Sequence, residues 1–300
     1  MDGLISKIQR YSTKDGPGVR STVFAVGCPL ACKWCANPEL IEPGVNILYH
    51  PSRCVGCGAC VALSHGTIRL VDGRCVIDRA ACSNLEACAD ACFYDAYERI
   101  GMSISAEDLG KKLLRDKVFY DQSGGGVTYS GGEAALQSDF FSDVTKYLKP
   151  HDVHVALDTT GYVGWRKLEP LVHAVDLVLY DLKALDPVIH RQYTGVDNRL
   201  ILENARKVAD MGTDMILRLL LVPGVNDTEA EIRRRLAFAK SLGPAVRQVD
   251  LLKYHRLGAG KYASLGLPEP MADTPECLDE VAEYAAKLGM DMGLSVTVNG

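Results

Sequence analysis

The chain has 300 residues, 47% of them hydrophobic and 24% charged, with a formal net charge of −5. This length and composition suit one large globular domain, or one domain with a small insert. The negative charge and the lack of a basic stripe exclude a nucleic-acid partner, and no apolar run approaches the roughly 18 residues of a membrane span. The first residues lack a signal-peptide pattern, so we expect a cytoplasmic protein.

Cysteine is the unusual component of this composition. The chain has 11 cysteines, and ten of them lie between Cys28 and Cys92. Thiols in a reducing cytosol do not persist as disulfides, so this clustering at short spacings indicates metal ligation. The eleventh, Cys277, lies among apolar residues at helical spacing, and we expect it in the core.

The predicted elements fall into three zones along the chain. Residues 1–48 contain a strand over 21–26 that leads into Cys28. Residues 49–98 hold seven cysteines and too few apolar residues for a core, so we expect metal to hold this segment together. Residues 99–300 alternate strands and helices, with strands predicted over 126–130, 153–158, 176–182, 215–221 and 248–253.

Helix boundaries are predicted at two places in the third zone. Ser105 with Asp108 three residues later is typical of a helix N-terminus. Thr274 and Pro275 predict the start of the last helix, and Gly289 predicts its end.

With the first strand, these elements make about six βα units. Repeated units of this kind form either a doubly wound sheet or a barrel, and periodicity does not choose between them. Polar residues recur at the carboxyl ends of the strands, where parallel α/β folds place their active sites. They are Cys28, Glu133, Asp158, Asp181, Lys183 and His255.

The first cysteine motif is Cys28-x3-Cys32-x2-Cys35. Three thiolates on one short loop suit three irons of a [4Fe–4S] cube, and they leave the fourth iron open for a substrate. A structural zinc site with a distant fourth ligand is the alternative. Zinc sites usually use paired C-x2-C spacings, so the motif favours the iron–sulfur cluster.

Together with other segments, this motif resembles the radical S-adenosylmethionine (SAM) superfamily. Over nearly its whole length the chain is similar to the glycyl-radical-enzyme activating enzymes, relatives of pyruvate formate-lyase activating enzyme. The matching segments are Asp15-Gly-Pro-Gly-Val-Arg20, Gly27-Cys-Pro-Leu30, Trp34-Cys-Ala-Asn-Pro-Glu39, Gly124-Gly-Gly-Val-Thr-Tyr-Ser-Gly-Gly-Glu133, Asp158-Thr-Thr-Gly161, Tyr180-Asp-Leu-Lys183, Tyr193-Thr-Gly-Val196, Val222-Pro-Gly-Val-Asn-Asp227 and Tyr254-His-Arg-Leu-Gly258.

The resemblance implies both a fold and a reaction. The fold is a partial (βα)6 TIM-like barrel in residues 1–48 and 99–300, with a ferredoxin-like insert over 49–98. In the reaction, a reduced cluster gives one electron to SAM, and the resulting 5′-deoxyadenosyl radical takes hydrogen from the Cα of a glycine in a partner glycyl radical enzyme. A flavodoxin or ferredoxin is the implied electron donor.

The resemblance also implies the site residues. Asp158 matches a position near a monovalent cation and the SAM carboxylate, and Asp15 one that seats the glycine-bearing peptide. Asp181 and Lys183 would contact SAM or line the site near that glycine. The positions implied to bind the cofactor are Trp34, Cys35, Ala36, Gly131, Gly132, Glu133, Asp158, Asp181, Lys183, Arg218 and His255. Independently, Arg218 interrupts an apolar strand, and a buried arginine requires a carboxylate partner.

The insert departs from a complete ferredoxin pattern. Cys54-x2-Cys57-x2-Cys60 lacks its fourth cysteine at Ser64, and Cys82-x5-Cys88-x3-Cys92 lacks its middle cysteine at Leu85. Because ferredoxin motifs exchange their fourth cysteines, Cys54, Cys57, Cys60 and Cys92 are predicted to hold one auxiliary [4Fe–4S] cluster. A second cluster at Cys82 and Cys88 requires that Cys75 or His65 be recruited.

Two other functions compete with the activating enzyme. One is a radical SAM enzyme that acts on a small molecule without a protein partner. The other is an electron-transfer module, which would leave about 250 residues outside the insert without a role. Productive cleavage of SAM with a metabolite and without a protein partner would favour the first of these, and absence of SAM binding would favour the second.

Overall fold

Nine strands form one sheet in the computed structural model, which describes residues 1–299; their order is β13-β12-β11-β10-β9-β8-β2-β1-β7. The bounds are β1 Asp2–Ser12, β2 Arg20–Ala25, β7 Met102–Ser105, β8 Gly126–Gly131, β9 His154–Thr159, β10 Leu177–Asp181, β11 Asp214–Leu221, β12 Val246–Lys253 and β13 Val296–Asn299. All six strands predicted from the sequence are present, each with bounds within two residues of those expected.

The parallel part of the sheet carries the predicted βα repeat. β2 and the strands from β8 to β13 pair in parallel, whereas β1 runs antiparallel to both β2 and β7. The edge strands β7 and β13 stand at opposite ends of the order, so the sheet of residues 1–299 is open. This confirms the α/β fold class and agrees with an incomplete barrel.

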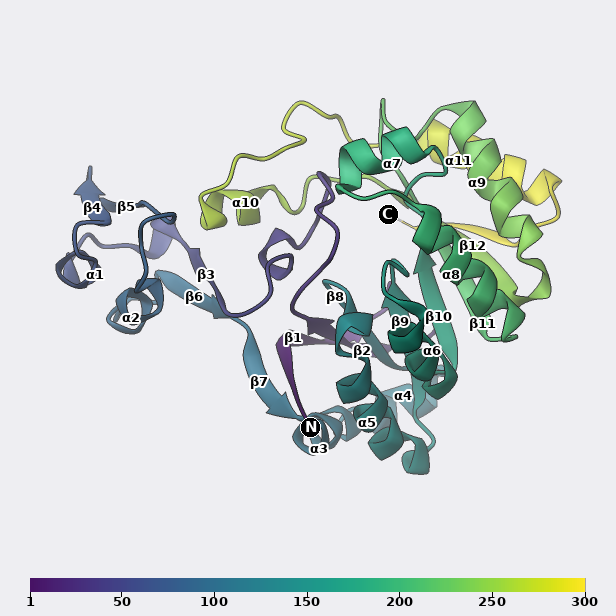
Figure 1. The fold of residues 1–300 in the computed structure, drawn as a ribbon, viewed down its shortest axis with the longest axis horizontal. Helices are drawn as coiled ribbons and strands as arrows, with labels where there is room; N and C mark the ends of the chain where they lie inside the picture. The colour runs from purple at the N-terminus through teal and green to yellow at the C-terminus, as the bar shows by residue number, and fades with distance from the viewer. Residues whose placement is uncertain (300) are drawn as a thin grey trace.

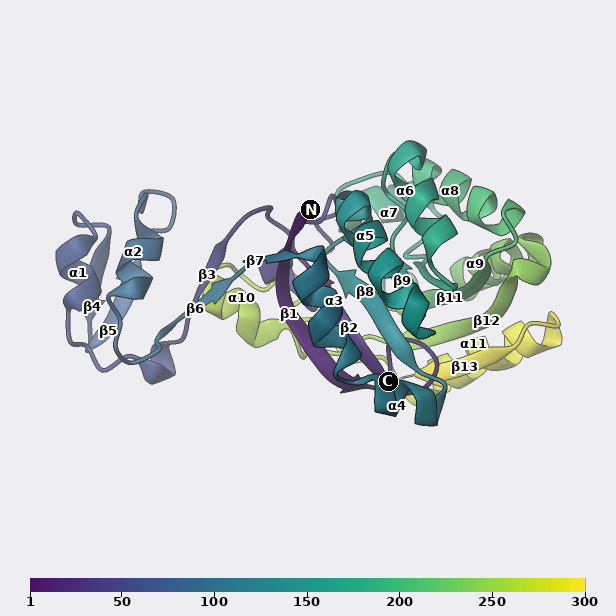
Figure 2. The same ribbon diagram turned by 90° about the horizontal axis from the view of Figure 1, so that it is seen from below.

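Most helices cover the outer face of this curved sheet, whereas the helix over 259–265 packs against the 3-10 turn Pro38–Leu40 and the strand over 46–49 (Figures 1 and 2). Their bounds are α3 Ala106–Leu114, α4 Lys117–Ser123, α5 Ser138–Leu148, α6 Trp165–Ala174, α7 Pro187–Thr194, α8 Arg199–Asp210, α9 Glu229–Ser241, α10 Ala259–Leu265 and α11 Asp279–Asp291. Short 3-10 turns lie at Pro38–Leu40, Pro51–Arg53, Ala134–Gln137, Lys149–His151 and Gly243–Ala245. Within residues 1–299, each helix is too short or too polar to cross a bilayer.

The main core lies between this sheet and its helices. Val127, Tyr129, Leu157 and Leu217 are completely buried there, as expected for strands covered on both faces. At the predicted N-terminus of α3, the Ser105 hydroxyl accepts a hydrogen bond from the Asp108 amide, which confirms the cap.

The predicted start and end of the last helix are wrong. α11 begins at Asp279 and continues past Gly289 to Asp291. Thr274 and Pro275 lie before it in an irregular segment, where the Cys277 amide donates to the Tyr254 carbonyl at 3.1 Å. This bond fixes the segment to the end of β12, so the helix starts later. Cys277 is buried in the core, as expected, although it lies outside the helix.

Residues from 46 to 100 project from the sheet as a separate arm (Figures 1 and 2). β3 (Asn46–Tyr49) and β6 (Tyr97–Ile100) pair antiparallel at its base. Beyond them lie α1 (Ala59–Leu63), a hairpin of β4 (Ile68–Val71) and β5 (Arg74–Ile77), and α2 (Leu85–Asp90). Asp72 and Gly73 both have positive φ, the geometry that a two-residue hairpin turn requires.

Candidate active site

The loop that carries the first three cysteines leaves β2 at the carboxyl edge of the sheet. The amides of Gly27 and Cys28 donate to the carbonyls of Leu40 and Ile41, at 2.8 and 2.9 Å. On the other side, the Lys33 amide donates to the Tyr193 carbonyl at 2.9 Å, and the Trp34 ring stacks on the Tyr193 ring at 5.8 Å. The loop is therefore held from two separate parts of the chain.

The three thiols of this loop fit an iron–sulfur cluster. Burial raises the pKa of the Cys28 and Cys32 thiols to about 12, and it also raises the pKa of Cys35. Bound metal deprotonates such thiols and supplies the positive charge that the buried thiolates need. Within residues 1–299, no three His, Cys, Asp or Glu side chains converge to hold a single ion. A cube of four irons instead distributes its thiolates over separate metal atoms.

The Gly131–Glu133 loop packs backbone to backbone against the start of the cysteine loop. The Gly132 amide donates to the Ala25 carbonyl at 2.9 Å, and the Glu133 amide donates to the Gly27 carbonyl at 2.8 Å. A Cβ atom on Gly132 would lie 2.3 Å from the Gly27 carbonyl oxygen. Glycine is required here because the two loops approach so closely.

Glu133 is completely buried directly after these glycines. Its carboxylate accepts from the hydroxyls of Thr159 and Thr160, both at 2.7 Å, and from the amides of Thr160 and Ala135. Burial raises the pKa of Glu133 despite these donors. Both carboxylate oxygens are thus already used to join the end of β8 to the end of β9.

Four charged side chains meet at the same edge of the sheet: Asp158 of β9, Asp181 of β10, Arg218 of β11 and Lys183, which lies two residues after β10. Arg218 pairs with Asp158 at 2.9 Å, and its Nε lies 3.9 Å from Asp181. Lys183 pairs with Asp181 at 2.7 Å. The sequence-based expectation that Arg218 faces a carboxylate is confirmed, since it faces two.

The pKa values of this group follow from burial and from mutual charge. Burial is the largest single influence, and alone it would raise the pKa of Asp181 and lower that of Lys183. The neighbouring charges together outweigh it: Lys183 and Arg218 lower the pKa of Asp181, and Asp181 with Cys32 raises that of Lys183. Burial dominates at Asp158, whose pKa is raised. The Oδ1 atom of Asp158 is buried without a hydrogen-bond partner among residues 1–299, while Oδ2 accepts from Ser130 at 2.6 Å. That free oxygen is available to a ligand or cation.

Four of the predicted cofactor residues line one recess of the surface. Trp34, Cys35 and Ala36 form one wall, and His255 lies on the other at the end of β12. Tyr262 of α10 also lines the recess. The structure therefore brings together three neighbouring motif residues and a histidine more than 200 positions away.

Sequence reasoning missed the residue that fixes this recess. Lys261 of α10 donates to Asn37 Oδ1 at 2.6 Å and to Glu39 Oε1 at 2.7 Å. Glu39 is 5% exposed, so its charge needs this partner. Both acceptors stand in the matching segment Trp34–Glu39, but no local pattern marks Lys261 as their partner.

Asp15 lies in the loop between β1 and β2. Its Oδ2 atom accepts from the hydroxyls of Ser12 and Thr22, at 2.5 and 2.7 Å. Buried Arg20 supports this loop by donating to the Pro17 carbonyl at 3.1 Å and to the Thr128 hydroxyl at 2.6 Å. Asp15 thus shapes the loop that was predicted to seat a peptide.

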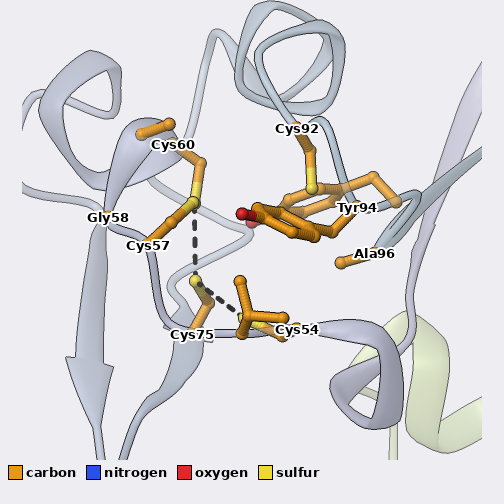
Figure 3. A pocket seen from close by; sticks show the side chains of 11 residues that line it. Cys54, Cys57, Gly58, Cys60, Cys75, Cys92, Tyr94 and Ala96 are labelled. Carbon is orange, nitrogen blue, oxygen red and sulfur yellow. Dashed lines mark hydrogen bonds between the residues drawn. The ribbon is translucent and has the colours of Figure 1, made fainter.

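The arm holds a second group of cysteines around a cavity (Figure 3). Its lining includes the predicted set Cys54, Cys57, Cys60 and Cys92, and also Cys75. The sequence suggests Cys75 for a second cluster, yet its Sγ lies 3.4 Å from that of Cys60 and 4.0 Å from that of Cys54. Cys82 and Cys88 instead share a hydrogen-bond acceptor, Asn84.

Comparison with known protein families identifies the family to which this site belongs. The model of the Radical SAM superfamily matches residues 22–237, which include the cysteine loop and the charged group on β9–β11. The chain belongs to the radical SAM superfamily. This confirms the resemblance drawn from the motifs, and the superfamily's [4Fe–4S] cluster and SAM therefore belong to this protein.

Full-length relatives place the chain among the glycyl-radical-enzyme activating enzymes. It is 40% identical to trans-4-hydroxy-L-proline dehydratase activating enzyme of Clostridioides difficile, over 87% of each chain. It is 37% identical to (2S)-3-sulfopropanediol dehydratase activating enzyme of Klebsiella oxytoca, over 90% of this chain and 87% of the relative. A third relative, 4-hydroxyphenylacetate decarboxylase activating enzyme of Clostridioides difficile (strain CD196), is 33% identical over 99% of this chain and 96% of its own.

Solved structures support the same fold. A domain of pyruvate-formate lyase-activating enzyme from Bacteroides vulgatus ATCC 8482 matches with a TM-score of 0.50 and 30% identity, covering 59% of this radical SAM chain and 99% of that one. A radical SAM methyltransferase from Sphaerobacter thermophilus matches with a TM-score of 0.55 and 13% identity, over 98% and 76% of the two chains. At that identity the likeness shows the fold alone.

Proposed function

We propose that this chain activates a partner glycyl radical enzyme by removing a hydrogen atom from the Cα of one of its glycines. The observation that carries the proposal is the meeting of three cysteines with the Arg218–Asp158–Asp181–Lys183 group on one open sheet edge. The Lys183 charge acts on the Cys32 thiol, which couples the two groups.

Cys28, Cys32 and Cys35 would hold the [4Fe–4S] cluster, which when bound supplies the electron that splits SAM. Arg218 and Lys183 offer cations to the carboxylate of SAM, and the free Oδ1 of Asp158 offers an acceptor to its amine or to a monovalent cation. Gly131 and Gly132 let their loop lie directly against the backbone of Ala25 and Gly27, next to the cysteine loop. His255, Trp34 and Ala36 line the recess beside Cys35.

Three predicted residues receive positioning roles. Glu133 uses both carboxylate oxygens on Thr159, Thr160 and Ala135, so we assign it to the loop that carries Gly132. Asp15 holds the loop between β1 and β2 through Ser12 and Thr22, and we assign that loop to the entry of the glycine-bearing peptide. Asp181 holds Lys183 in place.

We assign residues 49–98 to a ferredoxin-like insert with one auxiliary [4Fe–4S] cluster in the cavity of Figure 3. Cys54 and Cys57 lie on the segment before α1, Cys60 lies in the first turn of α1, and Cys92 follows the end of α2. Such thiolate sets are the usual ligands of iron–sulfur clusters. A small flavodoxin or ferredoxin is the proposed source of the electron.

The test is anaerobic reconstitution with iron and sulfide, followed by addition of SAM, a reductant and candidate glycyl radical enzymes. Electron paramagnetic resonance (EPR) should show a glycyl radical doublet on one partner. Cys35→Ala should abolish the doublet, whereas Cys277→Ala, which removes a buried cysteine far along the chain, should preserve it. Cleavage of SAM with a metabolite and without any partner would instead identify a small-molecule enzyme.

A further inference from the structure

We call the part of the arm around the cavity of Figure 3 its first half and the part around Cys82 and Cys88 its second half. The two halves hold unequal numbers of cysteine thiols. Five cysteines line the cavity of the first half: Cys54, Cys57, Cys60, Cys75 and Cys92. In Figure 3, Cys75 and Cys92 point into this cavity from opposite sides. A [4Fe–4S] cluster binds four thiolates, so this half holds one thiol more than a cluster needs.

The hairpin fixes the direction of the extra thiol. Cys75 is 7% exposed, whereas its neighbours Arg74 and Val76 on β5 are exposed, as strand alternation requires. The Cys75 amide also donates to the Tyr49 hydroxyl at 2.9 Å. Within the same cavity, the Tyr97 hydroxyl is buried without a hydrogen-bond partner among residues 1–299. Cys75 therefore faces a cavity in which the Tyr97 hydroxyl has no hydrogen-bond partner among residues 1–299.

The second half is closed by hydrogen bonds at the positions where cysteines are missing. The Ser64 hydroxyl donates to the Val61 carbonyl at 2.9 Å and accepts from the Ile68 amide at 3.0 Å, so it is fully used in the turn before β4. His65 is exposed and has a φ of 52°, a conformation fixed by the same turn.

Asn84 lies between Cys82 and Cys88, the two thiols of the second half, and accepts a hydrogen bond from each. Its Oδ1 accepts from Cys82 Sγ at 3.6 Å and from Cys88 Sγ at 3.9 Å, and its Nδ2 donates to the Leu63 carbonyl at 2.5 Å. Two thiols, with leucine at position 85 and serine at position 64, fall short of a cluster's four ligands.

We propose that the auxiliary cluster has an interchangeable fourth ligand, Cys92 or Cys75, and that the Cys82–Cys88 half holds no cluster. Cys54, Cys57 and Cys60 bind the other three irons. When Cys75 replaces Cys92, the Cys75 thiol releases one proton to water and the displaced Cys92 thiolate takes one up, so the exchange needs no oxidant or reductant. The inference rests on the auxiliary cluster of the proposed function.

The test uses the full chain with Cys28, Cys32 and Cys35 all replaced by alanine, so that only the arm binds iron. After anaerobic reconstitution this chain should hold about four irons and four sulfides. Cys75→Ser and Cys92→Ser should each retain about four irons, with different EPR spectra of the reduced cluster. The double variant Cys75→Ser/Cys92→Ser keeps only three cysteine ligands, so it should lose its irons to a chelator about tenfold faster than either single variant does. Cys82→Ser/Cys88→Ser is the matched pair and should retain them.

Three outcomes would overturn the inference. Loss of the irons in Cys92→Ser alone would show that Cys75 does not replace it. Equally slow loss of iron to the chelator in Cys75→Ser/Cys92→Ser and in the single variants, or about eight irons in the starting chain, would place a ligand or a cluster elsewhere. Absence of any cluster in the starting chain would remove the auxiliary cluster itself. Folding of the double variant is checked with the Cys28–Cys35 loop intact, where about four irons and SAM binding should remain.

Discussion

Arg218 on β11 forms an ion pair of 2.9 Å with Asp158 on β9, although β10 lies between their strands. The strand between them contributes Asp181, which stands directly opposite Arg218 in the ladder. One guanidinium thus bridges two carboxylates at the edge where the cysteine loop lies. Burial would lower the pKa of Arg218, but Asp158 and Asp181 outweigh it and raise that pKa, so the guanidinium stays charged.

Replacement of this arginine should damage both stability and binding. Arg218→Met leaves Asp158 buried without its counter-ion, and breaking a buried pair from one side costs about 3–5 kcal/mol. We expect the melting temperature, followed by circular dichroism under anaerobic conditions, to fall by about 10 °C. SAM binding, measured by calorimetry, should fall at least tenfold.

Arg247→Met is the matched control for that change. Arg247 also pairs with an aspartate, Asp214, at 2.8 Å, but both side chains are largely exposed. Exposed pairs contribute little, so stability and SAM binding should stay near those of the unmodified protein. Equal effects of the two substitutions would show that Arg218 acts only as one more surface charge.

Lys261 should prove to be a positioning residue for the cysteine loop. Lys261→Met leaves Glu39 buried and unpaired, at a cost of about 2 kcal/mol in the free energy of unfolding. Because Glu39 follows the loop of Cys35, the EPR spectrum of the reduced SAM-binding cluster should also change. The double variant Lys261→Met/Glu39→Gln should recover most of the lost stability, since the neutral amide needs no counter-ion. A double variant less stable than Lys261→Met would contradict this pairing.

The strands and the cysteine loop could be predicted from sequence because their signals are local. Apolar runs such as 215–221 mark a buried parallel strand, and the spacing of Cys28, Cys32 and Cys35 marks a cluster loop. The pairing of Arg218 with a carboxylate could be predicted because an unpaired charge inside an apolar strand is unfavourable.

Other features depend on contacts between distant segments, which periodicity does not encode. Lys261 and Glu39 are 222 residues apart. The start of α11 depends on the bond from Cys277 to Tyr254. Cys75 is distant from Cys54 and Cys60 in the sequence, but the β4–β5 hairpin brings its thiol next to theirs.

Gly132 should not tolerate a side chain. In Gly132→Ala the new Cβ would lie 2.3 Å from the Gly27 carbonyl oxygen, which is backbone and cannot rotate away. The resulting overpacking costs about 1–3 kcal/mol and displaces Gly27, the residue before Cys28. We expect less iron bound after reconstitution and at least tenfold weaker SAM binding. Gly164→Ala, whose new Cβ would have no other atom within 4 Å among the neighbouring residues, should leave both unchanged.

The stability of the protein should fall as the pH drops below the ordinary pKa of histidine. Burial lowers the pKa of His154, and the charges of Arg20 and Lys149 lower it further. The negative charge of Asp176 offsets part of this decrease. Arg20 Nη2 lies 3.2 Å from His154 Nδ1; since arginine only donates, Nδ1 accepts and is unprotonated. Protonation of Nδ1 would replace this hydrogen bond with repulsion.

The direction of the pH effect follows from proton linkage. Below about pH 6.5 the unfolded chain binds a proton at this histidine that the folded chain rejects, so the free energy of unfolding decreases as pH falls toward the lowered folded pKa. His154→Gln should reduce that slope between about pH 5.5 and 7.5 in denaturant titrations. His173→Gln, at an exposed histidine, is the control and should keep the original slope. An unchanged slope in His154→Gln would mean that His154 does not couple protonation to folding.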